Sequence, residues 1–180
     1  MKNLEENQLK REVIYDGSVL HVVKDTVLLP NGKEATREFC LHIGAVAIIA
    51  VTDEGKIIME RQYRYPHGRV FYEIPAGKLD YKGEDIMEAA KRELREETGA
   101  IAGKLTYLGQ ISPSPAILNE KIALFLAEKL TFGERELDDD EFLNIEYAEL
   151  DKLTKMVMNG EIEDAKTQVA ILRYAFLKNK

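Results

Sequence analysis

The sequence is poor in cysteine: Cys40 is the only one in 180 residues. A single cysteine excludes an intrachain disulfide and a metal site built from several cysteines. Cys40 itself is interpreted as a small core residue. This cysteine content is compatible with a cytoplasmic location, because disulfide-rich frameworks are typical of oxidising compartments.

Long apolar runs are also absent. No stretch of about 18 apolar residues occurs, which is the minimum for a helix that spans a membrane. The first twenty residues alternate charges with short apolar pairs, unlike the apolar core of a signal peptide. We therefore expect a soluble, cytoplasmic protein with no membrane partner.

An excess of basic residues is the third feature that the sequence lacks. The chain has 25 Lys and Arg against 32 Asp and Glu, a net charge of −7. A nucleic-acid backbone would meet net repulsion, so we expect no nucleic-acid partner. An anionic small molecule would need a local basic patch or bridging cations. The length and the 45% hydrophobic composition predict one folded domain with a substantial core and a small appendage.

The first 43 residues are predicted to form a β-meander. The predicted strands are residues 12–15, 19–29 and 35–43. Asp16-Gly17 and Asn31-Gly32 are the dipeptides that favour tight turns between them. Three strands alone make a poor core. We expect this subdomain, residues 1–43, to pack on the main domain, residues 44–180, or on a second copy of the chain.

The main domain is predicted to combine a mixed sheet with helices, which makes the fold class α/β (α+β). Alternating or continuous apolar residues predict strands at 44–51, 56–65, 69–77, 121–130 and 144–150. Helical patterns cover residues 85–98, 150–158 and 164–177. The first of these helices has Asp85 and Glu88 at the spacing of an N-cap with its reciprocal acid, and Gly99 just beyond its end.

The helix at 85–98 carries acidic residues on the side where it should pack. With residues placed roughly 100° apart and Glu93 at zero, the apolar stripe spans about −40° to 100°. Its members are Ile86, Ala89, Ala90 and Leu94. Glu97 falls inside this stripe at about 40°, and Glu96 on its border at about −60°.

Two interpretations of these acids are open. A solvated acidic face is the commoner meaning of a Glu-rich helix. However, like charges one turn apart repel, and an unpaired buried charge costs several kcal/mol. Arg92 can pair with Glu96, but one arginine does not neutralise three acids. A divalent cation such as Mg²⁺, which prefers oxygen ligands, is the physical alternative.

The segment GKLDYKGEDIMEAAKRELREETGA, residues 77–100, resembles the Nudix box of the Nudix hydrolases. The residues that keep the order and spacing of that signature are Glu84, Arg92, Glu93, Leu94, Glu96, Glu97, Gly99 and Ala100. One departure is an extra residue between Gly77 and Glu84, where six residues stand in place of five. The resemblance implies a Nudix fold, a mixed β-sheet sandwiched between helices, with an N-terminal antiparallel β-subdomain.

The resemblance also implies a cofactor and roles for particular residues. Members of the family hold Mg²⁺ or Mn²⁺ against a diphosphate, and water cleaves the P–O–P bridge. Carried over to this chain, the metal ligands are the carboxylates of Glu93, Glu96 and Glu97 and the backbone carbonyl of Ala76. Arg92 orients the glutamates.

Residues outside the box resemble the ADP-ribose pyrophosphatase branch of that family. The similar segments are REFCLHIGAVAII, ERQYR, EIPAG and DAKTQVA. Pro115 also lies sixteen residues after Gly99, as is typical of this branch. In the branch, a glutamate of the following loop approaches the attacking water, and Glu120 holds that place here. Ala116-Ile117-Leu118 replaces the glycine-containing form of the loop.

Four further residues are candidates for substrate binding by the same resemblance. Arg64 matches an arginine that the branch uses for the phosphates, although a plain surface charge is the alternative. Arg37 and Glu38 are either substrate contacts or ordinary exposed charges on a strand. Glu73 precedes the Pro-Ala-Gly segment and is either a substrate contact or structural.

The resemblance predicts a homodimer that hydrolyses ADP-ribose to AMP and ribose 5-phosphate, with the N-terminal subdomain crossing to the partner. Two alternatives remain open. One is hydrolysis of another nucleoside diphosphate derivative, such as an ADP- or GDP-sugar, NADH or a dinucleoside polyphosphate. The other is a non-catalytic sensor of ADP-ribose-like ligands.

Overall fold

The computed structural model describes residues 3–137 and 142–179. The described residues form two compact units. Unit 1 comprises Met1–Ile43 together with Ser112–Lys121, and unit 2 comprises Gly44–Ile111 together with Ile122–Lys180. Each unit is considered by itself below.

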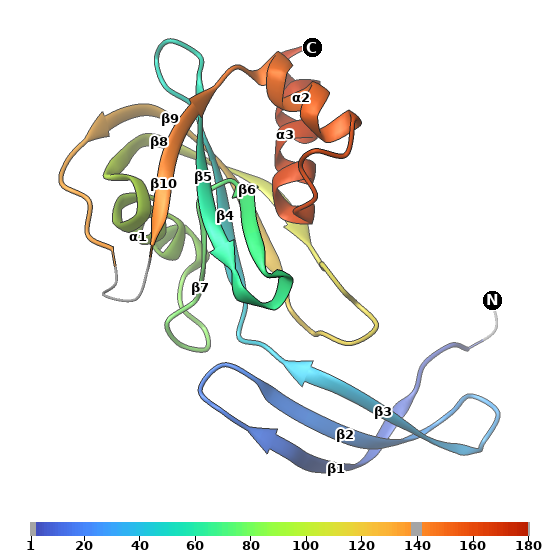
Figure 1. Ribbon diagram of the computed structural model, residues 1–180. Coiled ribbons are helices and arrows are strands. Elements are labelled where there is room, and N and C mark those ends of the chain that lie inside the picture. The colour runs from blue at the N-terminus through green and yellow to red at the C-terminus, as the bar shows by residue number, and fades with distance from the viewer. Residues whose placement is uncertain (1–2, 138–141, 180) are drawn as a thin grey trace. The chain divides into compact units, whose positions relative to one another are not determined.

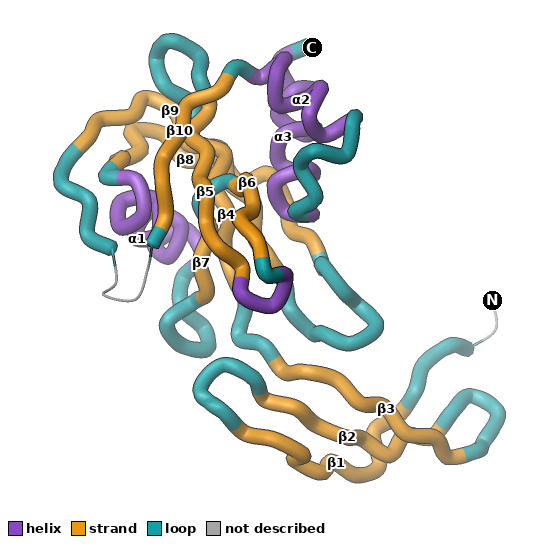
Figure 2. Tube along the Cα trace, in the orientation of Figure 1, coloured by secondary structure: helices purple, strands orange, loops and turns teal. Residues whose placement is uncertain are grey.

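Unit 1 contains a three-stranded antiparallel sheet in the order β1-β2-β3 (Figures 1 and 2). Its strands are β1 (Asn7–Asp16), β2 (His21–Leu28) and β3 (Glu34–Leu41). The predicted antiparallel meander is confirmed, but β1 begins five residues before the predicted start, because its first residues are mostly polar and exposed and show no apolar alternation. The second predicted turn contains Gly32, which has a φ of 80°.

Unit 2 contains two sheets. A four-stranded mixed sheet has the order β7-β4-β9-β8, and a three-stranded sheet has the order β10-β5-β6. The strands are β4 (Ala45–Ala50), β5 (Ile57–Arg64), β6 (Arg69–Glu73), β7 (Ala76–Lys78), β8 (Ala100–Ile111), β9 (Ile122–Phe132) and β10 (Leu143–Ala148). β4 and β9 are parallel, whereas the other paired strands of unit 2 are antiparallel.

Two details of the predicted strands were wrong. The segment 69–77, predicted as one strand, is divided at Ile74 and Pro75 into β6 and β7, which belong to different sheets. Pro75 has no N–H to donate to a strand ladder. β8 was not predicted, because its residues are mostly half-buried or exposed and include Gly103 and Gly109.

The central strand β4 supplies both cores of unit 2, because its side chains alternate between its two faces. Ala47 and Ile49 pack with helices α2 (Leu150–Met158) and α3 (Ala165–Lys178). Val46 and Ile48 pack with helix α1 (Ile86–Thr98). The helices therefore cover opposite faces of the sheet (Figure 1), which confirms the predicted mixed sheet between helices.

None of the helices in the described ranges combines the length and apolar character that crossing a membrane requires.

Candidate active site on helix α1

Helix α1 is fixed at both ends by the residues that the sequence indicated. Asp85 Oδ1 accepts hydrogen bonds from the backbone N–H groups of Met87, at 2.8 Å, and Glu88, at 3.1 Å. Gly99 has a φ of 72°, and its N–H donates to the carbonyl of Arg95 at 2.8 Å. This left-handed C-cap favours glycine. Glu88 differs from the expected reciprocal cap, since its carboxylate accepts a hydrogen bond from Lys91.

The acidic residues of α1 lie as the angular argument predicted. Glu93 is 8% exposed and Glu97 is 2% exposed, whereas Glu96 is partly exposed. The predicted apolar stripe is confirmed for three of its members, Ala89, Ala90 and Leu94, which are fully buried. It was wrong for Ile86, which is 39% exposed because it begins the helix and packing against the sheet starts one turn later.

Strand β7 lies against both buried glutamates. The N–H of Ala76 donates to Glu97 Oε2 at 2.9 Å. A Cβ placed on Gly77 would lie 2.0 Å from Glu93 Cδ, so only glycine allows the backbone to approach this carboxylate so closely. The backbone of β7 therefore lies directly against the carboxylates of Glu93 and Glu97.

Arg92 is the cation at the centre of this cluster. Its guanidinium contacts Glu93 at 2.9 Å, Glu96 at 3.1 Å, Asp80 at 3.2 Å and Glu84 at 3.4 Å. Burial alone would lower the pKa of Arg92, but the charge of Glu93 and hydrogen bonds to Glu84, Glu93 and Glu96 raise that pKa above its ordinary value. One guanidinium thus serves four carboxylates, which leaves an excess of negative charge.

The extra residue of the box lies in the loop that brings two of these acids to Arg92. Glu84 Oε2 accepts a hydrogen bond from the N–H of Asp80 at 2.7 Å, which closes the loop. Sequence reasoning did not identify Asp80 as a partner of Arg92, because the contact depends on the path of this loop.

The donor set fits a hard divalent cation. Within the described residues, no group of three or more His, Cys, Asp or Glu side chains is arranged to hold a metal ion by itself. Mg²⁺ does not require one, because it binds through one or two carboxylates and completes its octahedral shell with water and phosphate oxygens. The carboxylates of Glu93, Glu96 and Glu97 and the carbonyl of Ala76 are the groups that would hold it.

Arg64 and Glu73, two predicted substrate-binding residues, form a bidentate pair in unit 2. Arg64 Nε lies 2.8 Å from Glu73 Oε1, and Nη2 lies 2.8 Å from Oε2. Glu73 also accepts a hydrogen bond from Lys166, a contact that sequence reasoning missed. Burial alone would raise the pKa of Glu73, but hydrogen bonding to Arg64 and the charge of Lys166 hold that pKa below its ordinary value.

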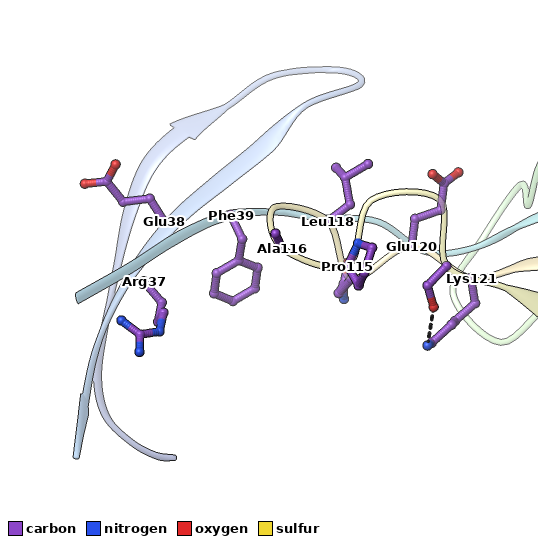
Figure 3. A pocket seen from close by; sticks show the side chains of 10 residues that line it. Arg37, Glu38, Phe39, Pro115, Ala116, Leu118, Glu120 and Lys121 are labelled. Atoms are coloured by element: carbon purple, nitrogen blue, oxygen red, sulfur yellow. Dashed lines mark hydrogen bonds between the residues drawn. The ribbon is translucent and has the colours of Figure 1, made fainter. Parts of the chain in front are cut away.

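Arg37, Glu38 and Glu120 belong to unit 1. They line a pocket of about 430 Å³ between β3 and the loop 112–121 (Figure 3). Arg37 and Phe39 extend to one side of β3 and Glu38 to the other. Arg37 contacts Glu6 at 2.5 Å, and Glu38 lies 3.7 Å from Lys24.

The loop that carries Glu120 pairs with the end of β3. Cys40 donates its N–H to the carbonyl of Ile117 at 2.9 Å and accepts from the N–H of Asn119 at 3.3 Å. His42 donates its N–H to Asn119 Oδ1 at 2.6 Å, and its ring Nδ1 lies 3.6 Å from Glu120. Sequence reasoning missed this pairing because the partners lie 77 residues apart.

The predicted site residues therefore fall into two groups. Unit 2 holds Arg64, Glu73, Ala76, Arg92, Glu93, Glu96 and Glu97, and unit 1 holds Arg37, Glu38 and Glu120.

Comparison with known proteins identifies the family of the chain. Residues 41–168 match the NUDIX domain, so the chain belongs to the Nudix hydrolase family. It is 48% identical to the ADP-ribose pyrophosphatase of Bacillus subtilis (strain 168) over 99% of this chain and 96% of that protein.

Other relatives are similar over most of their length. The methanol dehydrogenase activator of Bacillus methanolicus is 42% identical, over 94% of this chain and 92% of its own. The ADP-ribose pyrophosphatase of Mycobacterium tuberculosis is 35% identical, over 86% of this chain and 75% of its own. A crystal structure of an ADP compounds hydrolase superposes with a TM-score of 0.87 at 25% identity, covering 99% of this chain and 98% of that one.

Proposed function

We propose that the protein hydrolyses ADP-ribose to AMP and ribose 5-phosphate with Mg²⁺ as the cofactor, and that Mn²⁺ can replace it. The observation that carries the proposal is the placement of Glu93 and Glu97, which are buried on α1 against the backbone of β7. The choice of substrate is supported by 48% identity to an ADP-ribose pyrophosphatase over nearly the whole chain.

The groups of α1 and β7 supply the cofactor site. When bound, the cation neutralises the diphosphate, lowers the pKa of a bound water and stabilises charge on the leaving oxygen. Arg92 fixes the carboxylates of Glu93 and Glu96 through its contacts at 2.9 and 3.1 Å. Ala76 fixes Glu97 through its N–H.

The remaining residues bind substrate and move a proton. Arg64 donates to phosphate oxygens, and Glu73 fixes the direction of its guanidinium. Water adds to one phosphorus atom as the bridging P–O bond breaks, and Glu120 accepts the proton that this water loses. Arg37 and Glu38 contact the adenosine part of the substrate.

We also propose that the protein is a cytoplasmic homodimer in which residues 1–43 of one copy contribute to the site of the other. Strand β1 pairs only with β2 among the described strands and is an edge of its sheet. It carries the exposed apolar residues Leu9, Val13 and Tyr15. An apolar edge strand is a ready surface for association. The molar mass in solution, measured by light scattering, tests the dimer.

A panel of diphosphate substrates distinguishes hydrolysis of ADP-ribose from hydrolysis of other nucleoside diphosphate derivatives. ADP-ribose, ADP-glucose, GDP-mannose, NADH and diadenosine polyphosphates are compared at equal Mg²⁺. ADP-ribose is expected to have a kcat/KM at least about tenfold above each of the others, because a site built for one substrate discriminates through several polar contacts. A higher kcat/KM for another compound would identify that compound, and not ADP-ribose, as the preferred substrate. Binding of ADP-ribose without turnover of any compound would instead support the sensor alternative.

A further inference from the structure

The first turn of helix α3 is joined to the segment that follows β6. Asp164 caps the helix, and its Oδ2 accepts from the N–H of Thr167 at 2.9 Å and from the Thr167 hydroxyl at 2.5 Å. The same hydroxyl oxygen accepts a hydrogen bond from the N–H of Ile74 at 3.0 Å. Thr167 is fully buried. The start of α3 therefore has a fixed position relative to Glu73 and Ile74.

The fixed start of α3 places the side chain of Lys166 in contact with Glu73. Its ammonium donates to Glu73 Oε2 and lies 3.1 Å from Asp164 Oδ1. The side chain of Lys166 is only 11% exposed, and Glu73 is 3% exposed. Glu73 therefore serves two cations, the buried Lys166 and the more exposed Arg64, whose side chain is 39% exposed.

Lys166, the second cation, changes the net charge of the group of residues that Arg64 presents to an anion. A pair of Arg64 and Glu73 alone would be neutral, whereas the three residues together carry a net positive charge. The charge of Asp164 is partly offset by the N-terminal N–H groups of the helix that it caps. Arg64 is the cation at the outer, more exposed end of this cluster.

The geometry of Arg64 leaves one nitrogen available. Nε and Nη2 are both directed at Glu73, and Nη1 makes no hydrogen bond within the part of the chain that the structure describes. Hydrogen bonding to Glu73 is the main cause that raises the pKa of Arg64, and the charge of Glu97 contributes to it, so the guanidinium lies within electrostatic range of the acidic face of α1.

We propose that Lys166 is a positioning residue for the diphosphate: it holds Glu73 and offsets its charge, so that Arg64 is fixed in direction and remains positive toward the substrate. This proposal rests on the proposed function. It assigns to α3, which lies outside the Nudix box, a part in substrate affinity.

The test is the substitution Lys166→Gln, which removes the charge but keeps a hydrogen-bond donor for Glu73. KM for ADP-ribose is expected to rise about tenfold, because the contact of Arg64 with the diphosphate weakens by about the contribution of one hydrogen bond to a charged group, while kcat stays within about threefold. Lys166→Arg, which restores the charge, is expected to bring KM back to within about threefold of the wild type. The matched control is Arg69→Gln, an exposed arginine of β6 that pairs with Glu163 and should leave both constants unchanged.

Action through Arg64 is tested by combining substitutions. In an Arg64→Gln background, Lys166→Gln is expected to raise KM no further, because the group that it positions is gone. Two outcomes would overturn the proposal. One is a KM for Lys166→Gln equal to that of Arg69→Gln, even if the thermal midpoint falls. The other is a KM for the double variant that is raised by the product of the two increases seen in the single variants.

Failure of the proposed function gives a different result. In that case the wild type itself does not hydrolyse ADP-ribose, and the comparison is made by calorimetric binding of ADP-ribose in EDTA, without turnover. Weaker binding by Lys166→Gln than by Arg69→Gln would still support the positioning role. Equal binding by the two variants would overturn it.

Discussion

Gly77 lies directly against the carboxylate of Glu93, so that a Cβ at residue 77 would be 2.0 Å from Glu93 Cδ. The contact joins β7, which also carries Ala76, to the acidic face of α1. It explains why glycine stands at residue 77: a side chain would occupy the space that the carboxylate needs.

The substitution Gly77→Ala tests this contact. Since a carboxylate at the end of a flexible side chain moves more readily than backbone, we expect the protein to fold and Glu93 to be displaced. A displacement of about 1 Å typically lowers activity about 10²-fold, so we expect that loss in kcat. Gly133→Ala is the control, because its Cβ would meet only Ile101 Cδ1 at an ordinary 3.9 Å. Equal activity of the two variants would contradict the account.

Glu97→Gln tests the metal assignment. The glutamine keeps an oxygen that can accept from the N–H of Ala76, so the fold should be retained. Turnover should be almost completely lost, and Mn²⁺ binding, measured by electron paramagnetic resonance, should weaken. Glu88→Gln, at an exposed residue paired with Lys91, is the control for loss of one negative charge. A purely structural role predicts full activity and higher stability instead, because one repelling charge is removed.

Asp85→Ala tests the start of α1. Loss of the cap should lower the free energy of unfolding by about 1 kcal/mol, measured by urea denaturation, because the N–H groups of Met87 and Glu88 lose their acceptor. Asp85→Asn should retain most of the stability, since asparagine caps about as well as aspartate. Equal stability of the alanine and asparagine variants would show that the cap contributes nothing.

The pH dependence of stability tests the Glu73 cluster. The pKa of Glu73 is lowered in the folded protein, so its ionised form stabilises the fold. This contribution is fully present above the ordinary value of 4.5 and is lost as the pH falls through the lower, folded-state pKa. The stability advantage of the wild type over Glu73→Gln, from urea unfolding between pH 7 and pH 3, should therefore shrink in the acid range. An advantage that does not change with pH would contradict the assignment.

Helical periodicity was sufficient to predict which acidic residues of α1 are buried. Glu93 and Glu97 share a face with Ala90 and Leu94 because of their spacing alone, and the structure buries all four. Asp85 and Gly99 are likewise local signals, since each acts on backbone within one turn of itself.

Contacts between distant segments could not be predicted in the same way. Lys166 and Glu73 lie 93 residues apart, and nothing in either local pattern indicates the other. The pairing of Cys40 with Ile117 depends on how the loop 112–121 folds within unit 1. Strand β8 was missed because its mixed exposure and two glycines remove the alternation by which half-buried strands are recognised.

The most direct test of the central claim is the product of the reaction with ADP-ribose. Purified protein is incubated with ADP-ribose and Mg²⁺, and the products are separated by ion-exchange chromatography, with EDTA and the Glu97→Gln variant in parallel. We expect AMP and ribose 5-phosphate in equal amounts from the wild type, and neither product in the two parallel reactions. Absence of AMP from the wild type at every concentration of Mg²⁺ or Mn²⁺ would show that the protein does not catalyse this reaction.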